Sequence, residues 1–253
     1  MTSHILSVRL LGRFGLLNGP AALAVPPGTE RLLALLAVRG GAVGRSRIAG
    51  VLWPEVTEPR ARACLRSALL RLPPAARPAV QVTPTELALV RAVPVDLHAG
   101  QALARRLLDP ATRPVGPDLG SAALAVLAAE LLPDWYDDWV VAAGESWRQL
   151  RLHALEALAC HLAAARRYGE AAAAAVAAVA AEPLRESAHH ALISVHLAEG
   201  NRSEAIRQYG RYARLLRAEL GVEPTAALHR LLGPPGTPGA VTLGDTTWAT
   251  LRR

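Results

Sequence analysis

One short stretch of this sequence combines residue types that suit contact with a nucleic acid. Residues 58–72 predict a helix, because Thr57 can cap its start and Pro59 is favoured in a first turn. One helical face is apolar and consists of Ala61, Leu65, Ala68, Leu69 and Leu72. An α-helix in the major groove of DNA needs small side chains at close approach and guanidinium groups that reach guanine edges or phosphates. The opposite face offers both: it holds Ala63, Arg66, Ser67 and Leu70, flanked by Arg62 on one side and by Arg60 and Arg71 on the other.

The distribution of charge favours this interpretation over its alternative, a solvated Arg-rich helix surface. The 253-residue chain has a formal net charge of +7, and all 28 of its basic residues are Arg. The first 100 residues hold 12 Arg and 5 acidic residues, a net +7, whereas the rest of the chain holds 16 of each. We therefore expect a polyanion-binding N-terminal module joined to a neutral one. Because there is no Lys, a P-loop nucleotide site, a Schiff base and a catalytic Lys are excluded.

The elements around this helix predict a winged helix-turn-helix. Two helices with apolar faces precede it, Pro73-Pro74 ends it, and a hairpin with a turn at residues 83–86 follows. Three helices followed by a β-hairpin are typical of that fold. The expected ranges are Ile5–Leu11 and Phe14–Leu17 for two opening strands, Glu30–Arg39 and Ser46–Trp53 for the first two helices, and Val80–Val82 and Leu87–Arg91 for the hairpin.

The second half of the chain predicts an all-α repeat domain. Residues 147–232 have an almost continuous helical pattern, and the triplet at 169–171 (Gly-Glu-Ala) recurs at 203–205 (Ser-Glu-Ala), 34 residues later. That offset is the period of tetratricopeptide repeats, which are built from antiparallel helix pairs. Ala171 and Ala205 then occupy the small position of the second helix, and Asn201 has capping-box spacing to Glu204. Further expectations are helices at 102–108 and 121–132, a Pro/Gly-rich loop at 109–120, and a disordered tail at 233–253.

The residues that invite a catalytic or metal site have simpler explanations. The run Gly44 to Arg47 lacks the second glycine of a nucleophile elbow, and the adjacent acids Asp137 and Asp138 rarely converge on one centre. A metal site built from His189, His190 and His196 is disfavoured, because neighbours on a helix point apart. We therefore expect no enzyme activity, no metal and no cofactor.

Aromatic and cysteine residues indicate packing rather than chemistry. We expect Trp135, Tyr136 and Trp139 to pack in a core between the winged helix and the repeats rather than to form a ligand site. Cys64 and Cys160 fit no metal-ligand spacing and are expected to fill apolar space in a reducing cytosol. No run of 18 apolar residues exists, and the first residues lack a cleavage signal, so we expect a cytoplasmic protein without membrane contact.

These motifs together resemble the Streptomyces antibiotic regulatory protein (SARP) family of transcription activators. The family joins a winged-helix DNA-binding domain to a tetratricopeptide-like bacterial transcriptional activation domain. The N-terminal likeness lies in VRLLG, ERLLALLAVRGGAVGRSRIAGVLWP and ARACLRSALLRL. The C-terminal likeness lies in LLPDWYDDWV, LRLHALEALA and AAEPLRESAHHALISVHLAEGNRSEAIRQYGRYARLLRAELGVEP. The resemblance covers residues 5–232.

The resemblance implies an activator that binds double-stranded promoter DNA, often as a homodimer on direct repeats, and recruits RNA polymerase. Its targets would be secondary-metabolite gene clusters such as those of antibiotic biosynthesis, and its place would be the cytoplasm, at the nucleoid. It implies a DNA-binding domain at 1–98 and an activation domain at 99–232. The third helix carries the base-reading role by its place in the motif, with Arg62, Arg66 and Ser67 near bases and Arg60 and Arg71 near phosphates.

Two departures from the family's pattern keep a second hypothesis open. Pro73-Pro74 shortens the recognition helix, and the hairpin VTPTELALV places Glu86 near its tip, with Arg91 as the nearby cation. A carboxylate at the tip is repelled by phosphate. The alternative function is a helical-repeat scaffold that binds protein and whose winged helix no longer reads DNA. The two hypotheses differ in one property, which is DNA binding that weakens steeply with salt.

Overall fold

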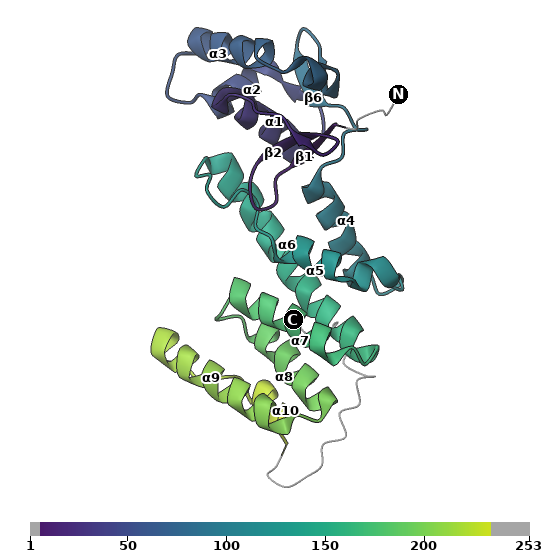
Figure 1. Ribbon diagram of the computed structural model, residues 1–253. Coiled ribbons are helices and arrows are strands. Elements are labelled where there is room, and N and C mark those ends of the chain that lie inside the picture. Colours follow the sequence, from purple (N-terminus) through teal and green to yellow (C-terminus); the bar gives the residue numbers. More distant parts are fainter. Residues whose placement is uncertain (1–5, 234–253) are drawn as a thin grey trace. The chain divides into compact units, whose positions relative to one another are not determined.

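The computed structural model describes residues 6–233, which form many α-helices and two small antiparallel sheets (Figure 1). The chain divides into two units. Unit 1 comprises the residues up to Ala102 together with Ala129–Gln149, and unit 2 comprises Leu103–Ala128 together with the residues from Leu150 onward. The expected disordered tail lies outside the described residues, apart from Gly233. The fold class is the predicted one, a winged helix-turn-helix followed by helical repeats.

Unit 1 begins with a three-stranded sheet in the order β1-β2-β3. Strand β1 (Leu6–Arg9) pairs antiparallel with β2 (Gly15–Asn18), which pairs with the short β3 (Ala21–Ala22). The turn between β2 and β3 uses Gly19 with a φ of 61°, a conformation that favours glycine. Both opening strands were predicted; β1 is shorter than expected, and β2 has the expected length but begins one residue later.

Three helices form the centre of unit 1: α1 (Pro27–Arg39), α2 (Arg45–Leu52) and α3 (Glu58–Leu70). They bury an aliphatic core, and the Thr29 hydroxyl of α1 donates a buried hydrogen bond of 3.0 Å to the carbonyl oxygen of Ala68 in α3. Helix α3 ends at Leu70 rather than at the predicted Leu72, because Pro73 restricts the residues before it. Core side chains from the three helices are Leu32, Leu33, Leu36, Ile48, Leu52 and Leu65.

The hairpin that follows α3 belongs to a second three-stranded sheet in the order β4-β6-β5. A 3-10 helix, η1 (Pro74–Ala79), leads into β5 (Val80–Val82), and β6 (Glu86–Leu89) returns beside it. Strand β4 (Val43–Gly44) precedes α2 and pairs with the start of β6. This β4–β6 pairing fixes the hairpin turn next to the N-terminus of α2.

Residues 129–149 pack in unit 1 although they lie far away in sequence. The backbone N–H of Leu132 donates to the carbonyl oxygen of Leu10 over 3.0 Å, and Trp135 stacks on Phe14. This pairing explains why helix α5 (Ser121–Ala128) ends four residues before the predicted position. The expectation for the aromatic cluster is wrong for one residue, because the Tyr136 side chain is 86% exposed.

The described residues of unit 2 form helices joined by loops and turns, with no strand among them. Helix α7 packs on α8, and α8 packs on α9. Helices α4 and α6 contain the boundaries at residues 102 and 149 and so contribute to both units. The helices not yet given are α4 (Asp96–Leu108), the 3-10 helix η2 (Gly116–Leu119), α6 (Asp138–Ala164), α7 (Tyr168–Ala181), α8 (Glu186–Glu199), α9 (Arg202–Leu220) and α10 (Ala226–Leu231).

The 34-residue offset corresponds to the observed helices. Helices α7 and α9 begin 34 residues apart, and the equivalent Ala171 and Ala205 are both fully buried. The predicted cap at the start of α9 is confirmed, because the Asn201 side chain accepts a hydrogen bond from the backbone N–H of Glu204. Small alanine side chains at these positions let the helices approach closely.

Candidate nucleic-acid interface

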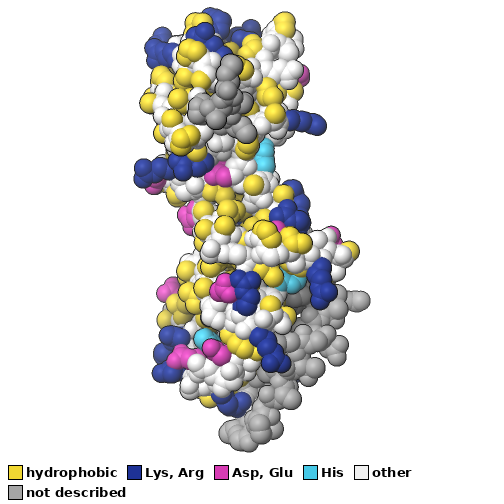
Figure 2. Space-filling view, turned by 45° about the vertical axis from the view of Figure 1, so that its right-hand side comes forward, with side chains coloured by type: hydrophobic (Ala, Val, Ile, Leu, Met, Phe, Trp, Pro, Cys, Tyr) yellow, Lys and Arg dark blue, Asp and Glu magenta, His cyan; other side chains and the backbone are white. Residues whose placement is uncertain are grey.

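A cleft of about 390 Å³ lies between the start of α2, the exposed face of α3 and the hairpin turn. It is open to solvent, and four Arg side chains line it. Figure 2 shows the dark blue Arg side chains gathered at the end of unit 1 that carries α3, at the top of that view. The lining residues are Gly44, Arg45, Ser46, Arg47, Arg62, Leu65, Arg66, Pro84 and Thr85.

The start of α2 adds to the positive potential of this cleft. Its N-cap is Gly44, which offers no side-chain cap, and the first turn contains no acidic residue. The N-terminus of a helix carries a partial positive charge and unsatisfied N–H groups, which makes it a site for anions. Arg45 and Arg47 place two more cations at the same helix end, so the local arrangement favours a phosphate.

Arg45 also positions the hairpin turn. Its backbone N–H donates to the carbonyl oxygen of Thr85 over 2.8 Å, and its guanidinium donates to the carbonyl oxygen of Thr83 over 3.2 Å. Within the turn, the Thr83 hydroxyl accepts a bond of 2.9 Å from the backbone N–H of Glu86. The turn is therefore held against α2, at one wall of the cleft.

The predicted reader Arg62 is held by neighbours on its own side of the cleft. Its guanidinium donates to the Glu58 carboxylate, one helical turn earlier, and to the Ser46 hydroxyl of α2 over 3.1 Å. All three groups are exposed to solvent. Part of the positive charge of Arg62 is thus compensated before any ligand binds.

Two other predicted residues of α3, Arg60 and Arg66, are unpaired. Their side chains are exposed and form no hydrogen bond or ion pair with any residue that the structure describes. Arg66 lines the cleft beside Arg62, whereas Arg60 does not. The small residue Ala63 and the 77% exposed Leu70 lie on the same open face. This face has the small and apolar contact residues that a groove-binding helix needs.

The remaining predicted residues lie elsewhere. Ser67 and Arg71 line a second, smaller cleft of about 160 Å³ between α3 and the start of α1, together with Trp53 and Cys64. Arg91 is exposed beyond the end of β6, whereas the turn that lines the main cleft precedes that strand. The structure therefore brings Arg62 and Arg66 together and places Arg71 and Arg91 apart from them.

Sequence reasoning missed Arg45 and Arg47 as candidate site residues. Their signal was present, since two Arg residues flank Ser46 at the start of a predicted helix. The missing information was the pairing of β4 with β6, which brings this helix start beside the turn.

One of the histidines of unit 2, His189, packs in the core. The His189 ring stacks on Tyr212 with 4.0 Å between ring centroids, donates through Nε2 to the carbonyl oxygen of Pro183, and accepts at Nδ1 from the Gln208 amide. His189 is therefore a core residue with a packing role. Over residues 6–233, no group of three His, Cys, Asp or Glu side chains has the arrangement of a metal site. The helices of this part also include none that is long and apolar enough to cross a membrane.

The fold and the site together define a winged helix-turn-helix followed by a helical-repeat domain. The family model of the bacterial transcriptional activator domain matches residues 95–233, so the chain belongs to that family of transcriptional regulators. A family of this kind is consistent with the expected lack of enzyme activity. The predicted resemblance to SARP-type regulators is confirmed.

The structure of Mycobacterium tuberculosis EmbR in complex with a low affinity phosphopeptide shares the fold, with a TM-score of 0.70 and 22% sequence identity. The match covers 90% of this chain and 64% of the EmbR chain, so this chain spans less than two thirds of its length. No curated protein matches the sequence.

Proposed function

We propose that this chain is a DNA-binding transcriptional activator whose α3 enters the major groove of promoter DNA. The observation that carries the proposal is the cleft in which Arg45, Arg47, Arg62 and Arg66 meet the uncapped start of α2. A DNA backbone phosphate in this cleft fixes the register of the protein, and the open face of α3 then reads base edges.

The predicted residues have different roles in this proposal. Arg66 is exposed and has no partner within residues 6–233, so it can form the bidentate contact with guanine that Arg side chains prefer. Arg62 and Ser67 flank it as further base contacts, and Arg60 and Arg71 contact phosphates. Arg91 contacts the backbone beyond β6.

Unit 2 supplies activation in this proposal. It holds RNA polymerase near the promoter, so that the gain in transcription is one of effective concentration. Two copies of the chain bind direct repeats in promoters of secondary-metabolite genes, in the cytoplasm at the nucleoid. The functional division lies near residue 98, and no cofactor takes part.

Fluorescence anisotropy of the full chain on promoter fragments, at several salt concentrations, tests DNA binding. Arg66→Ala is expected to weaken binding to the preferred fragment roughly tenfold and to reduce its preference over other fragments. Arg47→Ala is expected to weaken binding to all fragments alike and to lower the slope of log K against log salt by about 1. Arg13→Ala, which removes an exposed Arg of unit 1 outside the cleft, serves as the charge-matched control.

The scaffold alternative predicts a different result. If Arg66→Ala and Arg47→Ala change binding no more than Arg13→Ala does, the winged helix does not read DNA. The compensation of Arg62 by Glu58 is the observation that favours this alternative. The full chain is used because residues 129–149 pack in unit 1, so that truncation at residue 98 would remove part of its core.

A further inference from the structure

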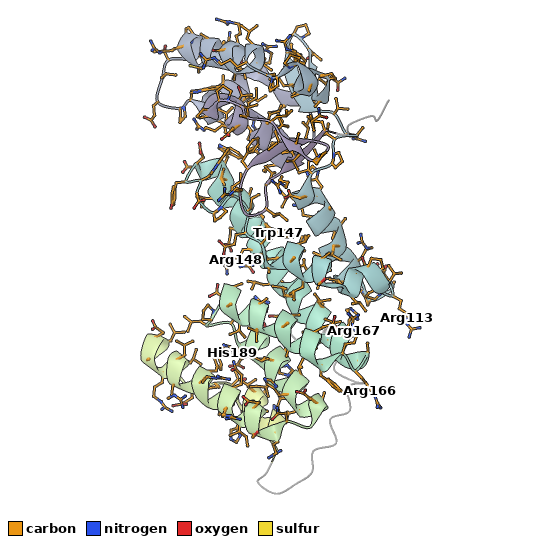
Figure 3. The ribbon with its side chains drawn as sticks, viewed as in Figure 1. Arg113, Trp147, Arg148, Arg166, Arg167 and His189 are labelled. Atoms are coloured by element: carbon orange, nitrogen blue, oxygen red, sulfur yellow. The ribbon has the colours of Figure 1, made fainter. Side chains whose placement is uncertain are left out.

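Two turns of unit 2 bring Arg side chains to one end of that unit. The ring Nε2 of His161, near the end of α6, lies 3.1 Å from the carbonyl oxygen of Leu107, near the end of α4. The loop after α4 and the turn after α6 therefore begin close together. Figure 3 shows Arg113 of this loop and Arg166 and Arg167 of this turn on the same side of unit 2. We name this group the arginine turn surface.

Some Arg residues around this surface are compensated by a neighbour, whereas Arg113 and Arg166 are not. Arg167 pairs with Glu170, and Arg106 pairs with the buried Asp118 over 2.7 Å. Arg113 and Arg166 are exposed and have no hydrogen-bond or ion-pair partner for their side chains among residues 6–233. The loop that carries Arg113 is ordered by Asp118, which also accepts a bond from the backbone N–H of Val115. The arginine turn surface thus presents two unpaired guanidinium groups, and the loop that carries Arg113 is held by hydrogen bonds.

The backbone conformation at Arg166 favours glycine, so the local fold gives no reason for an Arg at this position. Its φ is 58°, in the left-handed region that favours glycine. The N–H of Arg166 donates to the carbonyl oxygen of Ala163, and the next N–H donates to Leu162, which together form a Schellman motif. The same motif occurs at Gly200, 34 residues later. There the N–H of Gly200 donates to the carbonyl oxygen of Leu197, and the N–H of Asn201 donates to that of His196.

The repeat therefore offers an internal comparison at one position. Helices α1, α8 and α9 end on the left-handed glycines Gly40, Gly200 and Gly221, whereas the α6 turn retains an Arg there. Strained positions that keep an unfavourable residue are enriched at functional sites. An exposed Arg that sits at a position favouring glycine and has no hydrogen-bond or ion-pair partner among residues 6–233 is suited to contact another molecule.

We propose that the arginine turn surface binds an acidic protein segment that also carries apolar side chains. The inference deepens the proposed recruitment by unit 2, on which it rests. Its chemistry follows from the neighbours of the two free cations. Val115, two residues from Arg113, is 60% exposed, and Leu108 at the end of α4 is 39% exposed. Exposed apolar side chains beside Arg residues are typical of protein interfaces.

A nucleic acid fits this surface less well. A phosphate backbone offers charge but little apolar surface to cover Val115 and Leu108. A peptide with carboxylates for Arg113 and Arg166 and apolar side chains between them satisfies both kinds of group. The bidentate geometry of guanidinium and carboxylate then fixes the register of the segment.

A short fluorescein-labelled peptide that repeats Asp-Asp-Leu is the probe, with an all-Asp peptide and a DNA duplex as comparisons. We expect the full chain to bind the Asp-Asp-Leu peptide more tightly than the all-Asp peptide. Arg166→Gly should weaken this binding roughly fivefold, and adding Arg113→Ala should weaken it further by a similar factor. Because glycine suits the left-handed turn, Arg166→Gly should leave the melting temperature unchanged or raise it.

Two controls separate this surface from the rest of the protein. Arg214→Ala removes an exposed Arg of α9 and should not affect the peptide, and Arg66→Ala should weaken DNA binding while peptide binding persists. Peptide binding by Arg166→Gly at the wild-type level would overturn the proposal, as would equal affinity for the all-Asp peptide. A loss of DNA binding in Arg166→Gly with unchanged peptide binding would assign the surface to nucleic acid instead. Failure of peptide binding with DNA binding intact refutes this inference alone.

Discussion

The two units carry the same formal charge and use it differently. Over residues 6–233, each unit holds 13 Arg against 10 acidic residues, which leaves +3. In unit 1, four Arg residues line a single cleft, and the only one among them paired with a carboxylate of the described chain is Arg62. In unit 2, most ion pairs join residues that are close in sequence or buried, such as Arg207 with Glu204 and Arg185 with Glu156.

The comparison shows that net charge says less about function than the local balance of charge does. Counting along the sequence assigns the whole excess to the first 100 residues, because the five acids between Glu130 and Glu145 are counted with the second half. The structure places those residues in unit 1, where Arg31 of α1 pairs with Asp137. The proposed DNA binding by unit 1 therefore depends on where its Arg residues converge, and unit 2 keeps free cations at the arginine turn surface.

The largest expected effect comes from breaking the buried ion pair of unit 2. The Glu156 side chain is 2% exposed and accepts bonds of 2.7 Å from Arg185 Nε and from the Ser187 hydroxyl. Glu156→Ala leaves both donors without their acceptor, and we expect it to lower the free energy of unfolding by about 3 kcal/mol. Urea denaturation followed by circular dichroism measures this loss.

The matched change in unit 1 is Glu58→Gln, which breaks the exposed pair with Arg62. Because both side chains are more than half exposed, water replaces the lost contact, and we expect little change in the urea midpoint. If Glu156→Ala and Glu58→Gln destabilise the protein equally, the buried ion pair of unit 2 is no more important for stability than the exposed pair at the cleft, and the distinction is wrong.

A smaller effect is expected from acid. Burial is the main cause that lowers the pKa of His189 below its ordinary value of 6.5, with Arg211 also lowering it and Glu186 opposing the shift, and burial lowers the pKa of His190 as well. The unfolded chain then binds more protons than the folded one as pH falls below about 6.5, so unit 2 loses stability there. The pH dependence contributed by Asp96 of unit 1 has the opposite sign. Burial raises the pKa of this carboxyl group in the folded state, so its contribution to stability is lost as pH rises through that pKa.

Hydrogen exchange at about pH 7.5 and about pH 5.5, corrected for intrinsic rates, separates the two units. We expect protection in α8 and α9 to fall at the lower pH while protection in α1 is retained. His189→Gln keeps a donor for the carbonyl oxygen of Pro183 and cannot titrate, so it should reduce the pH dependence in α8. Unchanged pH dependence in this variant would assign the effect to other groups.

Local sequence patterns predicted the elements of the fold well and their long-range pairings poorly. The three helices of the winged helix, strand β5 and the long helical region from Trp147 were predicted because apolar periodicity and Pro or Gly signals are local. The bridge between Leu11 and Leu131 was missed, since no periodicity links residues so far apart. For the same reason the predicted helix at 121–132 was too long, and Tyr136 was wrongly expected in a core.

The site could be predicted in part for similar reasons. A helical wheel of α3 found Arg62 and Arg66, which line one cleft, because both lie on one helix. It did not find Arg45 and Arg47, whose position depends on the pairing of β4 with β6. The pairing of Glu58 with Arg62 was accessible from sequence, because residues four apart on a helix are neighbours.

The smallest expected effect sharpens the comparison at the cleft itself. Glu58→Gln removes the carboxylate that compensates Arg62, and it removes a negative charge from the surface that faces DNA in the proposed complex. We expect DNA affinity at low salt to rise by roughly two- to fivefold, and this gain to shrink as salt increases. Asp134→Asn changes the net charge of unit 1 equally at an exposed position outside the cleft, and it should have a smaller effect. If Glu58→Gln instead weakens binding to the preferred promoter fragment alone, the Glu58–Arg62 pair orients Arg62 for base contact, and the pair contributes to specificity rather than limiting affinity.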